Sequence, residues 1–310
     1  MKVLDMNDLT ADLQKPAVQP LLITGAHGTL GRAFQRVCAI RGIETVSLGR
    51  EEMDITDPIS VEKAIAQHNP WAVVNTAGYV RVDEAEADFE RCYRENTTGP
   101  AIVAAACAYR EIPFLTFSSD LVFDGNKSAA YVETDTPSPL NVYGNSKRLA
   151  ERDVLACMPN ALVVRTSAFF SPWDEYNFVY FALRAGHHKQ AFEAADDVLI
   201  SPTYVPDLVN ESLNLLIDEE KGVWHLANQG SYTWADLARL AADMANLDTS
   251  FVVPRSMQAF GLAAARPMYS VLSSEQGNMM SSVEERLGRC VSEMMHNISN
   301  LSEEPIAVAS

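Results

Sequence analysis

A tyrosine and a lysine stand four residues apart in the stretch NVYGNSK, residues 141–147. On an α-helix such residues share one face, so the side chains of Tyr143 and Lys147 would lie side by side. A free phenol has a pKa of about 10, and a neighbouring ammonium stabilises the phenolate and lowers that pKa. The pair is therefore a candidate for delivering a proton to a carbonyl oxygen, as the reduction of a ketone requires.

The spacing of this pair is not specific by itself. The chain has ten tyrosines and seven lysines, so chance alone gives about 0.2 such pairs. The alternative is an ordinary tyrosine and lysine on one helix face. Ser119, in TFSSDLVFDG, ends a predicted strand 24 residues before Tyr143. Its hydroxyl could hold the substrate carbonyl beside the pair, which favours the chemical interpretation. Lys147 would also bind the nicotinamide ribose.

Three glycines follow the first predicted strand and open the next helix in the stretch ITGAHGTLGR. They are Gly25, Gly28 and Gly31, and the loop also contains Thr29 and Leu30. Glycine lets the backbone turn sharply and lets phosphate oxygens approach the amides at the positive end of a helix. The G-x-x-G-x-x-G spacing therefore predicts a dinucleotide site, with a plain strand–helix turn as the alternative.

The residues after the second and third predicted strands bear on the choice of cofactor. NAD sites usually place an acidic residue after the second strand, whereas the first charged group here is Arg50, which suits the 2′-phosphate of NADPH. A solvated Arg50 and the use of NADH are the alternatives. Asp54 and Ile55 are candidates to flank the adenine, unless Asp57–Pro58 is simply a turn. Residues that end the third and fourth strands complete the predicted cofactor site: Ala77, Gly78, Tyr79 and Ser118.

Short apolar segments alternate with helical patterns between residues 20 and 167. The predicted helices include one with Ser60 as its N-cap and one over 95–111, and strands are predicted at 21–24, 44–48, 72–78, 113–119 and 161–167. Apolar strands without polar alternation, each separated by a helix, predict an α/β fold with a doubly wound parallel sheet. Two later segments, 194–204 and 222–230, are also expected to attach to the sheet.

The predicted organisation has four parts. A polar tail or linker at 1–19 precedes a dinucleotide-binding domain at 20–167, a smaller substrate lobe at 168–295 and a tail at 296–310. The lobe is expected to lie over the carboxyl edge of the sheet, where ligands of open α/β sheets bind. A homodimer, and a chain that is one module of a larger fused protein, are both left open.

The composition argues against several classes of protein. A formal net charge of −17 leaves no basic surplus to bind nucleic acid or an anionic membrane. No apolar run reaches the roughly 18 residues of a transmembrane helix, and the N-terminus lacks the apolar region of a signal peptide. The five cysteines are scattered, and His187 and His188 have no third ligand at metal spacing. Reduced thiols, a cytoplasmic location and no metal site are therefore expected.

Together, these motifs resemble the extended short-chain dehydrogenase/reductase superfamily and, within it, the dTDP-4-dehydrorhamnose reductase (RmlD-like) family. The resemblance runs from about Leu21 to about Arg289 and includes these stretches: VVNTAGYVRVDEAEAD, SPLNVYGNSKRLAE, NFVYFALR, DDVLISPTYVPDLV, GVWHLANQGSYTWADLA and ARPMYSVLSS. It implies a Rossmann-type sheet. It also implies reduction of the 4-keto group of a nucleotide-linked deoxysugar by a nicotinamide cofactor, giving dTDP-rhamnose.

Two positions depart from the family pattern. The family commonly has a tyrosine where this chain has Leu121 and a tryptophan where it has Ala168. By the resemblance both positions lie near the sugar, so the exact sugar is left open. The alternatives are a sugar-nucleotide epimerase or dehydratase, and a regulatory subunit without turnover like that of methionine adenosyltransferase. A dehydratase generally needs an Asp–Glu pair where this chain has Asp120 and Leu121, and a regulatory subunit is expected to lose the Ser–Tyr–Lys set.

Further residues are candidates for contacts with the nucleotide sugar, each with a structural alternative. Asp120 is either a substrate contact or a cap on the following turn. Asn177 is either a sugar contact or the N-cap of the next helix, and Arg266 either meets the nucleotide diphosphate or forms a salt bridge. For Asp83 and Glu86, the alternatives are an approach to the substrate pocket and an acidic solvated face, and the solvated face is favoured.

Overall fold

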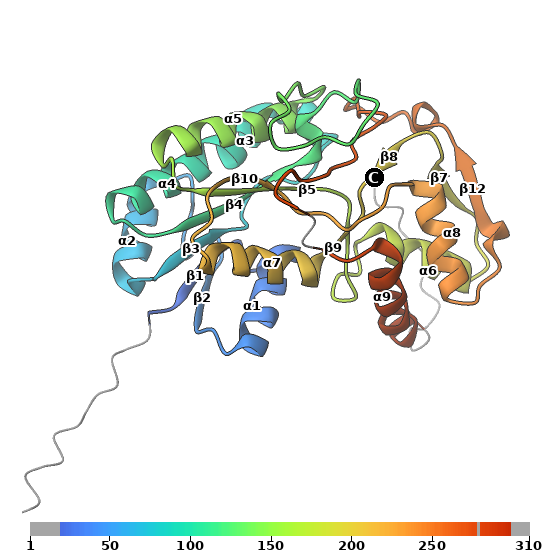
Figure 1. The fold of residues 1–310 in the computed structure, drawn as a ribbon, viewed down its shortest axis with the longest axis horizontal. Coiled ribbons are helices and arrows are strands. Elements are labelled where there is room, and N and C mark those ends of the chain that lie inside the picture. Colours follow the sequence, from blue (N-terminus) through green and yellow to red (C-terminus); the bar gives the residue numbers. More distant parts are fainter. Residues whose placement is uncertain (1–18, 278–279, 299–310) are drawn as a thin grey trace, which may run out of the picture.

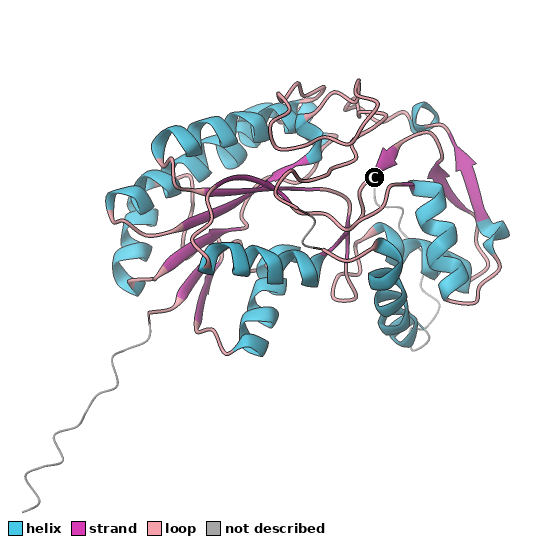
Figure 2. Ribbon diagram, viewed as in Figure 1, coloured by secondary structure: helices cyan, strands magenta, loops and turns pink. Residues whose placement is uncertain are grey.

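The computed structural model describes residues 19–277 and 280–298 (Figure 1). Residues 1–18 and 299–310, which fall in the predicted tails, lie outside these ranges. A central sheet covered by helices occupies one side of the molecule, and a smaller lobe adjoins it (Figures 1 and 2).

Six parallel strands form the central sheet, in the order β10-β5-β4-β3-β1-β2. They are β1 (Leu21–Thr24), β2 (Thr45–Leu48), β3 (Ala72–Asn75), β4 (Phe114–Ser119), β5 (Leu162–Thr166) and β10 (Gly222–His225). Every residue of β1, β3, β4 and β5 is buried, which is why these segments show no polar alternation. The predicted parallel sheet is confirmed, and the segment that begins at Gly222 joins it as expected.

Helices cover both faces of this sheet (Figure 1). One face packs against α1 (Thr29–Arg41) and α7 (Val205–Ile217), and the other against α2 (Pro58–His68), α4 (Gly99–Tyr109) and α5 (Val142–Cys157). Each face has its own buried apolar cluster, with Phe34 of α1 in one and Val61 of α2 in the other. The arrangement is the doubly wound one that the sequence predicts.

Two helices differ from their prediction. α2 begins at Pro58, and Asp57 caps it by accepting a hydrogen bond from the Ile59 amide (3.0 Å). Ser60, predicted to be the cap, instead accepts a hydrogen bond from the Asp54 amide (3.0 Å). Proline suits the first helical position because the N–H that it lacks would be unpaired there. The single helix expected over 95–111 is instead divided between a π-helical turn (Arg94–Thr98) and α4, and α3 (Phe89–Tyr93) precedes them.

The smaller lobe packs around α6, α8 and α9, which are Phe178–His187, Trp234–Met244 and Val283–Ile298. Three two-stranded sheets accompany these helices: β6 (Phe169–Phe170) with β9 (Thr203–Tyr204), β7 (Phe192–Ala195) with β12 (Val252–Arg255), and β8 (Leu199–Ile200) with β11 (Tyr232–Thr233). The expected attachment of segment 194–204 to the central sheet is therefore wrong. The short 3-10 helices are η2 (Glu84–Glu86), η4 (Asp120–Val122), η5 (Thr249–Phe251) and η6 (Met257–Phe260).

Parallel strands end at the same edge of a sheet, and here that edge gathers motifs from separate parts of the sequence. The glycine loop follows β1, Arg50 follows β2, Ala77 and Gly78 follow β3, and Ser119 ends β4. β1 lies between β2 and β3, so the connections on its two sides run in opposite directions across the sheet. This is the switch point at which open α/β sheets bind their ligands.

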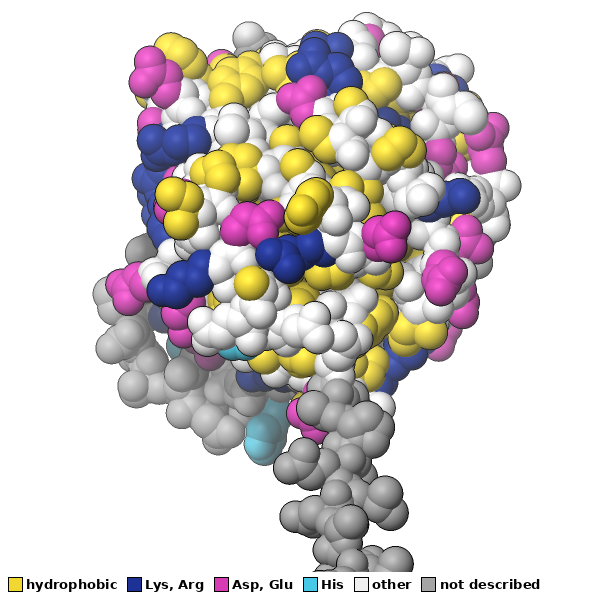
Figure 3. Space-filling view, turned by 90° about the vertical axis from the view of Figure 1, so that its left-hand side faces the viewer, with side chains coloured by type: hydrophobic (Ala, Val, Ile, Leu, Met, Phe, Trp, Pro, Cys, Tyr) yellow, Lys and Arg dark blue, Asp and Glu magenta, His cyan; other side chains and the backbone are white. Residues whose placement is uncertain are grey.

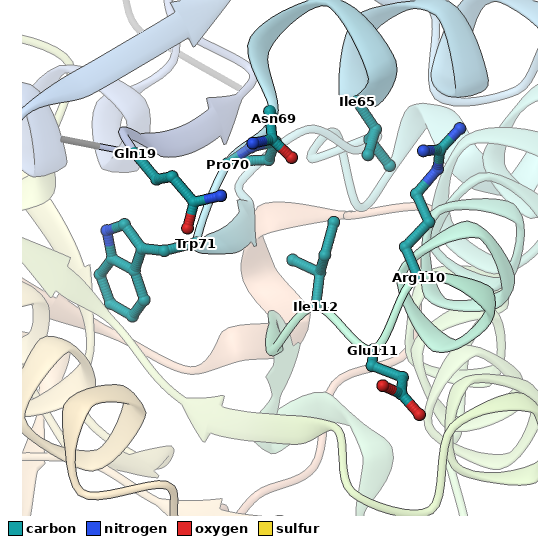
Figure 4. A pocket seen from close by; sticks show the side chains of 8 residues that line it. All are labelled: Gln19, Ile65, Asn69, Pro70, Trp71, Arg110, Glu111 and Ile112. Atoms are coloured by element: carbon teal, nitrogen blue, oxygen red, sulfur yellow. The ribbon is translucent and has the colours of Figure 1, made fainter. Parts of the chain in front are cut away.

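The opposite edge, where the strands begin, carries a pocket of about 450 Å³. Figure 4 shows its lining side chains. Among them, Trp71 directly precedes β3 and Ile112 lies two residues before β4. Arg110 on its wall is held by Glu62 (2.7 Å). On the end of the molecule shown in Figure 3, hydrophobic, basic and acidic side chains are interspersed. None of the predicted site residues lines this pocket, so it is separate from the candidate active site.

A buried ion pair joins α5 to the sheet and generates a stability prediction. Arg165 of β5 donates two hydrogen bonds to Glu151 of α5 (2.8 and 2.7 Å). Glu151→Gln leaves the buried guanidinium without its counter-charge, and we expect the free energy of unfolding to fall by about 3 kcal/mol. The matched control is Glu193→Gln, which breaks a half-exposed pair with Arg255 and is expected to change it by less than about 1 kcal/mol. Urea denaturation measures both, and equal losses would contradict the prediction.

Candidate active site

The structure brings Ser119, Tyr143 and Lys147 together at the carboxyl end of β4. Lys147 Nζ lies 5.8 Å from the centre of the Tyr143 ring and donates a hydrogen bond to the Phe117 carbonyl (3.2 Å). The Ser119 hydroxyl acts on the Tyr143 phenol in the direction that lowers its pKa. A hydroxyl, a phenol and an ammonium from β4 and α5 thus form one cluster.

The first turn of α5, which carries Tyr143, is held from several sides. Asn141 caps the helix by accepting a hydrogen bond from the Gly144 amide (2.7 Å), and its Nδ2 donates to the Ala265 carbonyl (2.7 Å). Glu86, expected on a solvated face, accepts a hydrogen bond from the first N–H of the helix (2.8 Å). A Cβ on Gly144 would lie 2.1 Å from the Leu121 carbonyl oxygen, so only glycine lets the helix approach η4 this closely.

The Tyr143 phenol is held in its protonated form. Burial raises its pKa, the negative charges of Asp120 and Cys92 add to the effect, and the hydrogen bond with Ser119 acts against it. The direction is opposite to the lowering by Lys147 that the sequence predicts, because loss of hydration disfavours the phenolate more than its neighbours favour it. A protonated phenol at neutral pH is the form that a proton donor requires.

Burial lowers the pKa of the Lys147 ammonium to about 8, while the charges of Cys92 and Glu151 act to raise it. A cation withdrawn from water loses hydration energy, so its neutral form is favoured. A Cβ on Gly78 would lie 3.7 Å from Lys147 Nζ, so the lysine is next to the loop that follows β3. Lys147 therefore lies between the candidate proton donor and the predicted cofactor loop.

Asp120 is buried, and its carboxylate accepts hydrogen bonds from three serine hydroxyls: Ser119 (3.0 Å), Ser167 (2.8 Å) and Ser270 (2.6 Å). Burial raises the pKa of this carboxyl, while the hydrogen bonds from the serines act to lower it. The sequence left a substrate contact and a turn cap as the alternatives. In the structure the carboxylate is instead the centre of a serine cluster behind Ser119.

The glycine loop has the shape of a phosphate cradle. Gly25 has a φ of +69°, and a Cβ there would lie 2.7 Å from the Ala77 nitrogen. A Cβ on Gly31 would lie 2.2 Å from the Gly25 carbonyl oxygen. Thr29 and Leu30 begin α1, where backbone N–H groups lack helical partners and the helix dipole favours an anion. The residues present therefore fit the pyrophosphate of a dinucleotide.

Asn96 is a site residue of which the sequence gives little sign. It lies in the π-helical turn, accepts a hydrogen bond from the Tyr79 amide (2.8 Å), and donates to the Tyr79 carbonyl and the Ser146 hydroxyl (both 3.0 Å). Ser146 in turn donates to the Tyr143 carbonyl (2.6 Å). Asn96 thus ties the loop after β3 to the helix that carries Tyr143. π-helical turns occur often at functional sites, but the sequence ENTTG contains no pattern that predicts one.

Arg50 forms a salt bridge with Glu95 (2.6 Å) and is half exposed. Glu95 is buried and also binds Arg91 (2.8 Å). Although burial acts to raise the pKa of Glu95, the hydrogen bonds from Arg91 and Arg50 hold it below its usual value. Of the two predicted neighbours of the adenine, Asp54 is partly exposed and Ile55 is buried in the core beside α2. The contact between Arg50 and a 2′-phosphate stays a prediction.

The predicted substrate residues of the lobe have structural partners. Both terminal nitrogens of Arg266 bind Asp83, which is the salt bridge weighed against a diphosphate contact. Asp83 is therefore paired and does not lie on a solvated face. Asn177 caps α6 by accepting a hydrogen bond from the Tyr180 amide (3.1 Å). Ala168 lies two residues after the end of β5 and has a φ of +36°. Contacts of these residues with a sugar stay predictions.

Neither a cluster of metal ligands nor a membrane-spanning helix occurs in residues 19–277 and 280–298. Within them, no three His, Cys, Asp or Glu side chains are grouped so as to hold a metal ion. No helix in these ranges combines the length and the apolar character needed to cross a bilayer. All five cysteines are free thiols.

The lowered pKa of Lys147 predicts a pH-dependent gain of stability in a variant. Below pH 8 the folded protein carries a buried ammonium that the unfolded chain hydrates fully. Lys147→Met should therefore raise the free energy of unfolding at pH 7, by about 2 kcal/mol. The unfolded lysine loses its proton near its ordinary pKa of 10.5, so the difference should disappear as the pH rises from about 8 to that value. Urea denaturation at pH 7 and pH 10 measures it, and a less stable variant at pH 7 would refute the prediction.

Comparison with known proteins identifies relatives over most of the chain. A dTDP-4-dehydrorhamnose reductase of Mycobacterium tuberculosis is 37% identical over 263 residues, which cover 83% of this chain and 85% of that protein. A dTDP-4-keto-6-deoxy-D-glucose reductase of Streptomyces niveus is 32% identical over 256 residues, which cover 82% and 88%. The crystal structure of a dTDP-4-dehydrorhamnose reductase of Bacillus anthracis in complex with NADP has a TM-score of 0.85 and 31% identity, covering 89% of this chain and 99% of that one.

The family model for the RmlD substrate binding domain matches residues 19–297, which is nearly all of the described chain. The chain belongs to the RmlD substrate-binding domain family.

Proposed function

We propose that this protein catalyses the NADPH-dependent reduction of the 4-keto group of dTDP-4-dehydrorhamnose, giving dTDP-rhamnose. The observation that carries the proposal is the cluster of Ser119, Tyr143 and Lys147 beside the glycine cradle at one edge of the sheet. The reductase relatives, and the solved relative that holds NADP, support the same reaction and cofactor.

The reduction adds a hydride to the carbonyl carbon and a proton to its oxygen. The reduced nicotinamide supplies the hydride when bound. Tyr143 donates its phenolic proton to the oxygen, and its burial keeps that proton in place until the substrate arrives. Lys147, as a cation beside the ring, stabilises the phenolate that remains. Ser119 orients the carbonyl next to the phenol.

Two ends of the candidate site would hold the cofactor. The N–H groups at Thr29 and Leu30 would bind the pyrophosphate. Arg50 would bind the 2′-phosphate and would give up part of its salt bridge with Glu95. At the other end, the buried hydroxyl of Ser118 has no hydrogen-bond partner among the residues that the structure describes, which leaves it available to the nicotinamide half.

We assign cofactor binding to residues 20–167 and substrate binding mainly to the lobe at 168–295. Segment 264–266 supports this division, because it reaches from the lobe to Asn141 and Asp83 beside the catalytic helix. Leu121 and Ala168 each lie two residues beyond the carboxyl ends of β4 and β5, so they would border the sugar. Since one relative is named for dTDP-4-keto-6-deoxy-D-glucose, that sugar is the second substrate to assay.

We also place the enzyme in the cytoplasm, where NADPH is available and thiols stay reduced; the five free cysteines are in keeping with such a compartment. A homodimer stays a prediction.

The direct test follows the absorbance of the reduced nicotinamide in the presence of dTDP-4-dehydrorhamnose, with NADPH and NADH compared. We expect substrate-dependent oxidation, with NADPH preferred. Tight NADPH binding without oxidation by either keto sugar would favour a regulatory subunit, and an epimerised product without net oxidation would identify an epimerase.

Tyr143→Phe removes only the phenolic hydroxyl. We expect kcat to fall by about 10²- to 10⁴-fold because the proton donor is lost, while the Kd for NADPH stays unchanged. Steady-state rates and a fluorescence titration with NADPH measure the two quantities. The matched control is Tyr109→Phe, a phenol that is 85% exposed on α4. A Tyr143→Phe enzyme with nearly wild-type kcat would show that Tyr143 is not the proton donor.

Arg50→Gln tests the selection of the cofactor. We expect the Kd for NADPH to rise about tenfold and the Kd for NADH to stay the same, because only NADPH has the phosphate that the guanidinium would bind. Arg255→Gln, another half-exposed arginine in a salt bridge, is the control. An equal loss with both cofactors would instead show that Arg50 acts through Glu95 on the structure of the site.

A further inference from the structure

The serine cluster around Asp120 has a function to explain. Its carboxylate is only 6% exposed, and the hydrogen bonds that it accepts come from Ser119, Ser167 and Ser270. These serines come from the end of β4, the residue after β5, and a segment of the C-terminal part of the chain, 150 positions from Asp120. An isolated buried carboxylate would be costly, so three donors at one carboxylate are a built arrangement.

Counting protons limits what Ser119 can do. A serine hydroxyl has one proton to donate, and an ionised carboxylate only accepts. While Asp120 is charged, the proton of Ser119 points to the Asp120 carboxylate, so Ser119 has no proton to donate to another acceptor. The substrate carbonyl, and later the Tyr143 phenolate, are acceptors as well. The single proton of Ser119 cannot serve them while Asp120 holds it.

We propose that Ser167 and Ser270 are positioning residues for the reduction. By holding the Asp120 carboxylate with two hydrogen bonds, they free Ser119 to turn its single proton towards the reacting oxygens. That proton goes first to the substrate carbonyl, and then to the Tyr143 phenolate once the phenol has given up its own. Ser119 keeps its proton throughout and only rotates its O–H bond. The proposal rests on the proposed function, because it deepens the role of Ser119 in that reaction.

Both serines are fixed well enough for this role. The Ser270 amide donates to the Leu199 carbonyl (2.9 Å), and the next residue accepts a hydrogen bond from the Tyr131 amide (2.8 Å), so this segment is held from both sides. Ser167 directly follows β5, whose last residue is paired in register with Ser119. Ser167 and Ser270 are 4% and 1% exposed. Neither side chain faces solvent, so their hydroxyls are reserved for the buried carboxylate.

The charge balance of the cluster supports the same view. Burial raises the pKa of Asp120, and the hydrogen bonds from Ser270 and Ser167 count among those that lower it, so two donors remain when Ser119 turns away. The ionisable group coupled to this cluster is Tyr143 of α5, whose pKa the charge of Asp120 raises. Without Ser167 and Ser270, Ser119 would be the only serine that donates a hydrogen bond to the carboxylate. Asp120 would then hold the Ser119 proton more strongly.

The first test is a mutational cycle measured by steady-state reduction. We expect Ser167→Ala and Ser270→Ala together to lower kcat about tenfold with little change in KM. In a Ser119→Ala background, the same two changes should have almost no further effect, because no Ser119 proton is left to release. Ser212→Ala is the matched control, since this buried serine of α7 has no hydrogen-bond partner for its hydroxyl. A double variant with wild-type kcat, a rise in KM alone, or an equal loss in the Ser119→Ala background would each overturn the proposal.

The second test does not depend on turnover. With carboxyl-labelled aspartate, NMR follows the titration of Asp120 in the wild type and in the Ser167→Ala/Ser270→Ala protein, with Asp120→Asn to assign the signal. We expect the pKa of Asp120 to rise when the two donors are removed. An unchanged titration would overturn the proposal even if kcat falls. If the wild type reduces neither keto sugar, the proposed function fails on its own, and the titration still decides whether these serines hold the carboxylate.

Discussion

The active-site geometry depends on how closely the first turn of α5 approaches the end of β4. The Leu121 carbonyl oxygen occupies space that a side chain at position 144 would need, since a Cβ there would come within 2.1 Å of it. Because Gly144 has no side chain, the helix packs close enough to η4 to bring Tyr143 and Lys147 beside Ser119. Asn141 at the N-cap and Asn96 behind the helix then keep the turn in that place. Catalytic contacts tolerate little displacement, so this one close contact governs the chemistry.

The cluster that results is costly to bury. Tyr143, Lys147 and Asp120 each have a pKa shifted by burial in the direction that disfavours the charged form. A core built only for stability would not contain three such groups together, and proteins accept such strain mainly at functional sites. The buried pair of Arg165 and Glu151 lies one turn further along α5 and anchors the helix to the sheet. Rigid support next to a destabilising cluster is what a preorganised site requires.

The strands and the cofactor loop could be predicted from the sequence because their signals are local. An apolar run bounded by turns, or three glycines at fixed spacing, is complete within a few residues. The partners of Arg266 and Asp120 lie up to 183 and 150 positions away, and no local pattern specifies them. The raised pKa of Tyr143 could not be predicted for a related reason. The spacing of Tyr143 and Lys147 in the sequence indicates a neighbouring positive charge, but it does not indicate how deeply the phenol is buried. Segment 194–204 was misplaced because a short apolar run does not say which strand it pairs with.

Substrate binding and catalysis are joined more tightly than a two-part description of the fold suggests. One segment of the lobe contacts the catalytic side repeatedly. The Ala265 carbonyl accepts from Asn141, Arg266 and the Ala264 amide bind Asp83, and Ser270 donates to Asp120. The first contact bears on the helix of the proton donor, and the last on the carboxylate behind Ser119. A change in the lobe that moves this segment would therefore alter the protonation chemistry along with the fit of the sugar. For this reason, if the proposed sugar contacts are correct, sugar specificity would be easier to alter at Leu121 and Ala168, which lie two residues beyond β4 and β5, than along residues 264–270.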